Sequence, residues 1–199
     1  MQAVFKTGFK AAIGTGLRAG VAAIALGVCA SAASDDAAAA DRTLDKLFLQ
    51  LSKAPDEDAA KPIEVEIVTH FLASGSASVD LLMSRTEASL DGHDPRTAMK
   101  LLDAVTSIAP AYAEGWHQRG KLEADAGQDE AAMVSLQKAV TLNPRQFQAL
   151  AELGDLLAAY GAKPAALANY KKALALDPHL EGLDRRVQDL SRAVEGDKI

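Results

Sequence analysis

Beyond residue 40, apolar residues recur every three or four positions along most of the chain, which is the spacing of amphipathic helices. This pattern predicts a first pair of helices at 41–53 and 60–73 and a last helix at 181–194. Ala, Leu and Val supply most of the apolar positions, and aromatic residues make up only 5% of the chain. We therefore expect an all-α protein of closely packed helices with essentially no strand.

A repeat with a period of 34 residues lies between these helices and is marked by Pro110, Pro144 and Pro178. The same order of apolar and small residues precedes each proline, so the period predicts three copies of one helix pair. The copies occupy 79–112, 113–146 and 147–180, between an amino-terminal helix pair at 41–78 and a capping helix and tail at 181–199. Their helices are expected at 79–91 and 95–108, at 113–126 and 129–142, and at 147–160 and 164–176.

Two glycines, Gly120 and Gly154, stand inside predicted helices at the same position of the second and third copies. A glycine in a helix interior costs up to about 1 kcal/mol relative to alanine, so another interaction must offset this cost. We interpret the glycines as space for large side chains of the paired helices, namely Trp116, Leu136 and Tyr170.

Glycines also mark the ends of the first helices of the second and third copies, at Gly127 and Gly161. A glycine there adopts the left-handed conformation that ends a helix without steric cost. In the first copy Gly92 comes one residue early and leaves His93 at the turn. The first copy is therefore the least regular of the three.

The second copy contains Trp116, Gly120, Ala132, Leu136 and Pro144 in the order and spacing of a known 34-residue signature. With the in-phase third copy, this pattern resembles the tetratricopeptide repeat family over residues 79 to 180. The resemblance implies an α-α superhelix, a solenoid of about three stacked repeats with flanking helices. The pair at 41–78 is then expected to stack on the first repeat as a degenerate capping hairpin, and the last helix to cap the other end.

The resemblance further implies that the first helix of each repeat lines a concave groove that binds a protein or peptide. The groove positions are Asp80, Met83, Glu87, Leu90, Asp91, Glu114, His117, Lys121, Asp125, Gln148 and Asp155, together with four alanines, Ala124, Ala151, Ala158 and Ala159. Six of these residues are acidic and only Lys121 is basic, which favours a partner segment that carries Lys or Arg. A merely solvated acidic face explains the same composition equally well. Met83 and Glu87 stand where the family's clamp for acidic peptide ends would have Lys and Asn, so such peptides are poor candidates.

The first 32 residues have the order of a secretory signal peptide. Lys6, Lys10 and Arg18 give a basic start with no acid before Asp35, and a charge-free, Ala-rich stretch follows. We expect cleavage after Ala32, a flexible linker at 33–40 and a periplasmic location. Two alternatives remain open: an uncleaved membrane anchor, although the apolar stretch is short, and lipidation, for which Cys29 is the only cysteine.

Charge narrows the class of partner. Loss of residues 1–32 removes three cations and no anion, which moves the formal net charge from −6 to −9. A protein that binds nucleic acids or anionic membranes needs a basic face, so we expect neither as a partner of this acidic chain. We also expect no stable membrane insertion after cleavage. The mature chain would also lack cysteine, which excludes disulfides and thiolate chemistry.

The sequence offers no site-like cluster of reactive groups. The four histidines are scattered, and the only close pairing, Glu66 with His70, reads as a surface contact because a metal site needs a third protein ligand. No phosphate-binding, dinucleotide-binding or nucleophile motif is present, so we expect no cofactor, metal or enzymatic activity. The leading interpretation is a periplasmic adaptor or assembly factor of the cell envelope. The alternative is a membrane-anchored envelope assembly factor.

Overall fold

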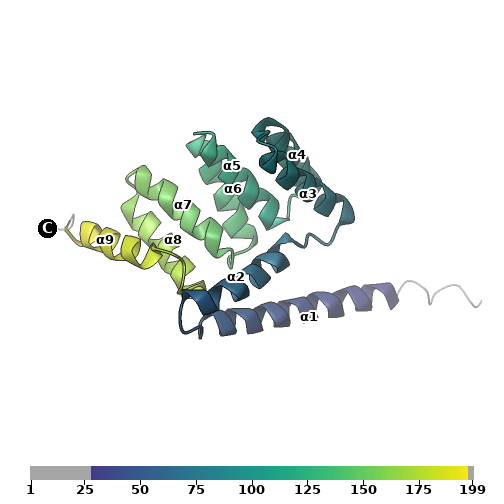
Figure 1. The fold of residues 1–199 in the computed structure, drawn as a ribbon, viewed down its shortest axis with the longest axis horizontal. Helices are drawn as coiled ribbons and strands as arrows, with labels where there is room; N and C mark the ends of the chain where they lie inside the picture. Colours follow the sequence, from purple (N-terminus) through teal and green to yellow (C-terminus); the bar gives the residue numbers. More distant parts are fainter. Residues whose placement is uncertain (1–27, 197–199) are drawn as a thin grey trace, which may run out of the picture. The chain divides into compact units, whose positions relative to one another are not determined.

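A computed structural model describes residues 28–196, and this part of the chain contains nine helices and no strand (Figure 1). The helices are α1 (Val28–Leu51), α2 (Glu57–Leu72), α3 (Ala77–Asp91), α4 (Pro95–Ile108), α5 (Ala113–Asp125), α6 (Asp129–Leu142), α7 (Phe147–Ala159), α8 (Lys163–Leu176) and α9 (Leu183–Gly196). The predicted all-α class is confirmed. The six helices expected within the repeats begin and end within two residues of their predicted bounds.

The first helix begins earlier than the sequence pattern indicates. We expected it to start at 41 after a linker at 33–40, but α1 begins at Val28 and runs through that segment. The run Ala37 to Ala40 explains the difference, because alanine has the highest helix propensity of all residues. Most of the predicted signal peptide, residues 1–32, lies outside the described residues. Within residues 28–196, no helix is long and apolar enough to cross a membrane.

The described residues from Ala40 onward form one compact unit, whose centre is three helix pairs. Helix α3 packs on α4, α5 on α6 and α7 on α8, and successive pairs join through α4 with α5 and α6 with α7 (Figure 1). Leu136, Leu153 and Tyr170 belong to the core between the second and third pairs. Helix α9 covers α8 and buries Leu183, as expected of a capping helix.

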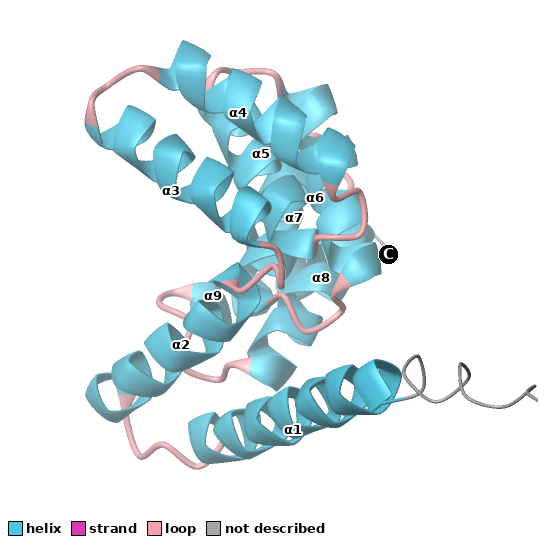
Figure 2. Ribbon diagram, turned by 90° about the vertical axis from the view of Figure 1, so that its right-hand side faces the viewer, coloured by secondary structure: helices cyan, strands magenta, loops and turns pink. Residues whose placement is uncertain are grey.

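The amino-terminal helix pair lies in a different place from the one predicted. It does not stack on the first repeat; α2 contacts α5, and the pair shares a core with the start of α7 (Figure 2). The ring of Phe147 lies 6.3 Å from that of Phe48 and 6.4 Å from that of Phe71 between centroids. Arg145 strengthens this contact, since its guanidinium lies 4.2 Å from the Phe48 ring centroid and 2.7 Å from an Asp45 carboxylate oxygen. These aromatic and ionic partners on the second and third repeats account for the correction.

The two helix-interior glycines accommodate large side chains, as predicted. A Cβ atom at Gly120 would lie 2.8 Å from Leu136 Cγ, and one at Gly154 would lie 2.5 Å from Tyr170 Cδ1. The interpretation differs for Trp116, which is only partly buried; its indole Nε1 donates to the Pro110 carbonyl at 3.0 Å. Close helix approach thus depends on glycine opposite Leu136 and Tyr170.

Substitution Gly154→Leu should lower the free energy of unfolding by about 1–3 kcal/mol, because the new side chain has to displace the buried Tyr170 ring. Gly196→Leu is the matched control, since a Cβ atom there meets nothing within 4 Å. Urea unfolding of both variants measures the effect. Equal midpoints would show that Gly154 is not required by packing.

The turns after the first helices follow the predicted chemistry. Gly127 and Gly161 have φ values of +70° and +75°, and His93 takes the same left-handed conformation in the first repeat with φ of 57°. The backbone N–H of the residue after each of these three positions donates to a carbonyl five residues earlier, which closes the helix end. A histidine therefore occupies a position that favours glycine.

Substitution His93→Gly should stabilise the protein by about 0.5–1 kcal/mol, because glycine adopts this conformation without strain. The reciprocal change Gly127→His should destabilise it by a similar amount. Thermal melts of both variants test the pair, and a lower melting temperature for His93→Gly would contradict the assignment.

Candidate functional site

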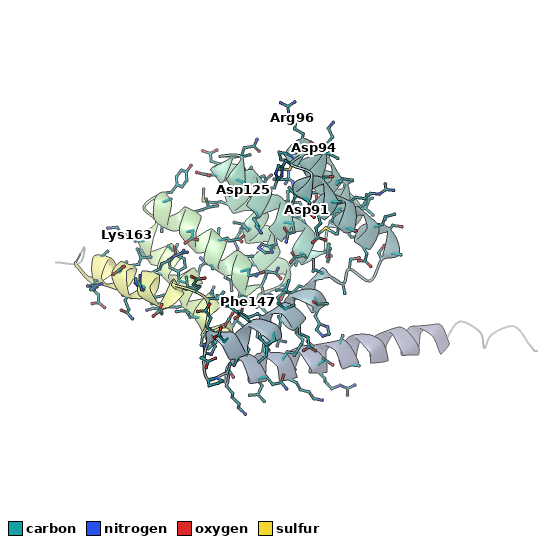
Figure 3. All side chains as sticks on the ribbon, in the orientation of Figure 1. Asp91, Asp94, Arg96, Asp125, Phe147 and Lys163 are labelled. Atoms are coloured by element: carbon teal, nitrogen blue, oxygen red, sulfur yellow. The ribbon has the colours of Figure 1, made fainter. Side chains whose placement is uncertain are left out.

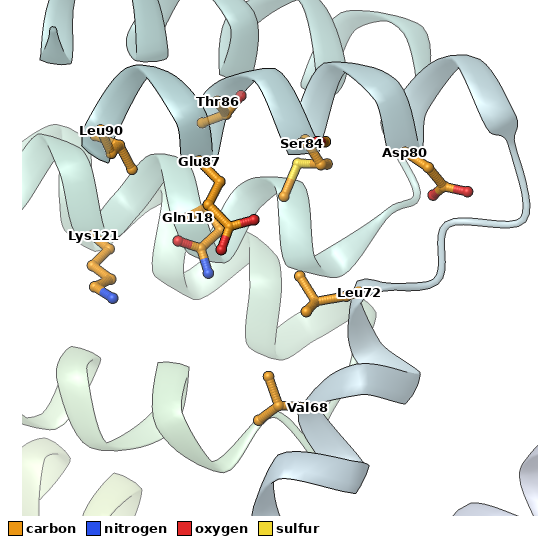
Figure 4. A pocket seen from close by; sticks show the side chains of 10 residues that line it. Val68, Leu72, Asp80, Ser84, Thr86, Glu87, Leu90, Gln118 and Lys121 are labelled. Atoms are coloured by element: carbon orange, nitrogen blue, oxygen red, sulfur yellow. The ribbon is translucent and has the colours of Figure 1, made fainter. Parts of the chain in front are cut away.

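An open cavity of about 440 Å³ lies between α2 and α3 and extends to α5 (Figure 4). We call it the α2–α3 groove; it is lined by Val68 and Leu72 of α2, by Asp80, Met83, Ser84, Thr86, Glu87 and Leu90 of α3, and by Gln118 and Lys121 of α5. Five of the residues predicted for the binding surface line it, namely Asp80, Met83, Glu87, Leu90 and Lys121. The first and second repeats thus contribute to one site.

The α2–α3 groove has apolar surface on both of its sides. Leu72 of α2 is 42% exposed and Leu90 of α3 is 37% exposed. Met83 differs from the prediction, because it is buried in the core that α3 shares with α4 and offers little surface to a ligand. The apolar walls are therefore supplied mainly by the partly exposed leucines Leu72 and Leu90.

The charged residues of the α2–α3 groove have different roles. Asp80 is occupied, because one of its carboxylate oxygens accepts from the Ser74 backbone N–H at 3.1 Å and from Ser74 Oγ at 2.5 Å. This contact fixes the connection between α2 and α3. Glu87 and Lys121 are exposed, and neither forms an ion pair with any residue in the described part of the chain (Figure 4). Glu87 is thus available to a cationic ligand.

A second cavity of about 260 Å³ continues from Lys121 towards α7 and includes Asp125 and Asp155. Asp125 is exposed (Figure 3). The Asp155 carboxylate accepts from Arg186 of α9 at 2.7 Å and from the Tyr170 hydroxyl at 2.7 Å. Because Arg186 neutralises Asp155, the acidic surface at this end is smaller than the sequence suggests.

Two further polar residues predicted for the binding surface lie outside both cavities. Asp91 is exposed at the last turn of α3 (Figure 3), and Gln148 is half-buried on α7. Neither lines the α2–α3 groove or the second cavity.

Glu114 and His117 require a correction, since we predicted both on the groove surface and both are buried, each with 2% exposure. His117 Nδ1 lies 3.3 Å from a Glu114 carboxylate oxygen, and Nε2 lies 3.0 Å from a carboxylate oxygen of Glu152 on α7. The side-chain amides of Gln118 and Gln146 both donate to Glu114. A buried carboxylate is tolerated only when it is paired in this way, so the cluster joins the second repeat to the third and its Glu114 and His117 offer little surface to a partner.

The charges of this buried cluster support one another. Burial alone would lower the pKa of His117, but the hydrogen bonds and negative charges of Glu114 and Glu152 outweigh it and raise the pKa to about 9. Burial likewise favours the neutral form of Glu114, yet His117 and the two glutamine amides lower the pKa of that carboxyl. At neutral pH the cluster therefore holds an imidazolium between two carboxylates.

Comparison with known proteins bears on the repeat assignment. A model of the tetratricopeptide repeat family matches residues 113–146, the segment predicted as the second repeat. Residues 113–146 therefore carry a tetratricopeptide repeat, as the sequence predicts. The chain is 37% identical over 79 residues to the TPR repeat-containing protein RHE_CH03534.1 of Rhizobium etli. The match covers 40% of this chain and 39% of that protein, so the chain spans well under half the length of its relative.

Solved tetratricopeptide repeat structures share the fold. The Sgt2 domain of Aspergillus fumigatus matches 62% of this chain and 83% of its own, with a TM-score of 0.55 and 22% identity. The type III secretion chaperone SycD of Yersinia enterocolitica, solved with a peptide of the translocator YopD, matches 62% of this chain and 97% of its own. Its TM-score is 0.54 and its identity 17%. Tetratricopeptide repeat domains typically mediate binding to proteins or peptides, as SycD does.

Sequence reasoning missed the contribution of α2 to the α2–α3 groove. Val68 and Leu72 line it, but periodicity only placed them on an amphipathic helix. The sequence signal available was that Leu72 falls near the end of the predicted helix at 60–73. In the residues that the structure describes, no group of three His, Cys, Asp or Glu side chains could hold a metal ion.

Proposed function

We propose that this tetratricopeptide repeat protein binds a basic segment of a partner protein on its concave side, as an adaptor or assembly factor that acts without catalysis. The observation that carries the proposal is the α2–α3 groove, with its exposed leucines and an unpaired Glu87. Asp91 and Asp125 add exposed negative charge nearby on α3 and α5. Such a surface attracts Lys and Arg, while the leucines offer apolar contact area.

We further propose that the protein works in the periplasm after export. The basic start, the Ala-rich stretch and the small residues before Ala33 support this location. The mass of the protein purified from cells tests it, with a chain that begins near Ala33 as the expected result. An intact Met1 chain in the cytoplasm would contradict export, and a lipid-modified Cys29 would favour the membrane-anchored alternative.

Partner capture tests the binding function. The double variant Glu87→Lys and Asp125→Lys should lose its partner from a periplasmic extract, because it reverses two exposed charges of the concave side. Its melting temperature should stay close to that of the unmodified protein, since exposed charges contribute little to stability. Gln137→Lys, at an exposed position of α6, is the matched control and should capture the partner normally. Undiminished capture by the double variant would overturn the proposed site.

A further inference from the structure

Two valines and one leucine of α2 form an apolar row along that helix. Val65, Val68 and Leu72 are spaced three and four residues apart, which places them on one side of a helix. Val65 is 66% exposed and Leu72 is 42% exposed, whereas Ile67 of the same helix is fully buried against α1 and α7. Val68 is partly buried against the same core as Ile67, so Val65 and Leu72 are the exposed members of this row. Val68 and Leu72 also line the α2–α3 groove, so this part of the row is accessible to a ligand there.

The carboxyl end of α2 is held in position beside α3. The Tyr112 hydroxyl, at the start of α5, donates to the Leu72 carbonyl at 2.8 Å. Ser74 and Asp80 tie the connection to the first turn of α3, and the contacts of Phe147 hold the body of α2. Figure 2 shows α2 and α3 leading away from this connection in different directions. A wall fixed at both ends loses little freedom when a ligand binds, which favours affinity.

We propose that α2 and α3 form a clamp for a basic amphipathic helix of a partner protein. The apolar side of that helix contacts Leu72 and Val68 on one side and Leu90 on the other. A Lys or Arg of the helix pairs with Glu87. This inference rests on the proposed binding function and adds a wall that the three repeats alone do not provide.

Charge selects a basic helix over an acidic one. The lining of the α2–α3 groove carries Asp80 and Glu87 against Lys121, and Asp91 and Asp125 extend the negative surface on the same helices. An acidic partner would place its carboxylates against this excess, which costs free energy, whereas a cation near Glu87 gains an ion pair. The occupant therefore combines apolar residues with Lys or Arg.

The test uses a synthetic helical peptide of Ala, Leu and Lys, about 14 residues or roughly 21 Å long. Isothermal titration measures its affinity for the full chain, and control peptides replace either its leucines with serine or its lysines with glutamate. We expect both controls to bind at least about tenfold more weakly, and the parent peptide to weaken as salt rises. Equal binding of all three peptides, or none by the parent, would overturn the clamp.

Variants of the protein separate the clamp from the proposed function. Leu72→Asn should weaken the parent peptide about tenfold, because it removes one apolar wall. It should fold normally, since Leu72 is well exposed and Tyr112 bonds only its backbone. Leu81→Asn, at a 53% exposed leucine outside the α2–α3 groove, is the control and should bind normally. If Glu87→Lys weakens binding and Leu72→Asn does not, the clamp is wrong while the groove remains the site. If neither matters, both proposals fail.

Discussion

The free energy of unfolding should fall by about 3 kcal/mol as the pH rises from 6.5 to above 9, because His117 loses its proton in that range. A pKa of about 9 in the folded protein, against 6.5 for an ordinary histidine, means that the folded state holds the proton more tightly. The stabilisation is therefore complete below pH 6.5 and is lost as the pH passes 9. Urea unfolding at a series of pH values measures it.

The acidic side of the profile depends on Glu114. Its pKa is lowered in the folded protein, so its contribution is complete above the ordinary value of 4.5 and is lost as the pH falls further. Stability should thus have a plateau between about pH 5 and 6.5. Folding that is equally stable at pH 6 and pH 9 would contradict the ionised cluster.

Substitution His117→Gln isolates the cause. It should cost about 3–5 kcal/mol at pH 6, since it leaves the buried Glu114 carboxylate without its cation. It should also flatten the pH dependence above 7. His93→Asn is the matched control, because His93 is exposed and asparagine tolerates its left-handed backbone. The control should keep the full profile of the unmodified protein.

Truncation of Phe147 to alanine should lower the free energy of unfolding by about 3–5 kcal/mol, as expected for a buried aromatic ring. Phe147 is 1% exposed and contacts the rings of Phe48 and Phe71, so its loss leaves a cavity beneath the amino-terminal helix pair. The loss of local stability should be greatest in α2, so the substitution should speed up amide hydrogen exchange more in α2 than in α4 and α6. Hydrogen exchange with mass spectrometry resolves the two regions.

Tyr160 supplies the control for this variant. It is an aromatic residue directly after α7, but it is 57% exposed, so Tyr160→Ala should change stability by less than about 0.5 kcal/mol. Uniformly faster exchange throughout Phe147→Ala, with no preference for α2, would show that Phe147 does not anchor the amino-terminal pair.

The repeats were predictable because they are encoded locally. The 34-residue spacing of Pro110, Pro144 and Pro178 gave the register, and helical periodicity then gave the bounds of α3 to α8. The close contact at Gly154 was predictable for the same reason, since a residue that is unfavourable in a helix interior indicates that a neighbouring helix needs the space. In each case the physical cause lies within one helix or its partner.

The candidate site was less predictable because its geometry depends on contacts between distant parts of the chain. Glu114 and His117 look like solvated residues of an acidic helix until Gln146 and Glu152, far along the chain, are placed beside them. The position of α2 depends similarly on Phe147 and Arg145. A helical pattern shows that a helix has an apolar face, but it does not show which surface that face covers.

The central claim is that the partner binds on the concave side, between α2, α3 and α5. Hydrogen exchange of the full chain, measured with and without a purified partner protein from the capture experiment, locates the contact directly. We predict slower exchange in the last turns of α2, along α3 and along α5, with little change elsewhere. Slower exchange confined to α4, α6 and α8 would contradict the claim, because the partner would then bind the second helices of the repeats.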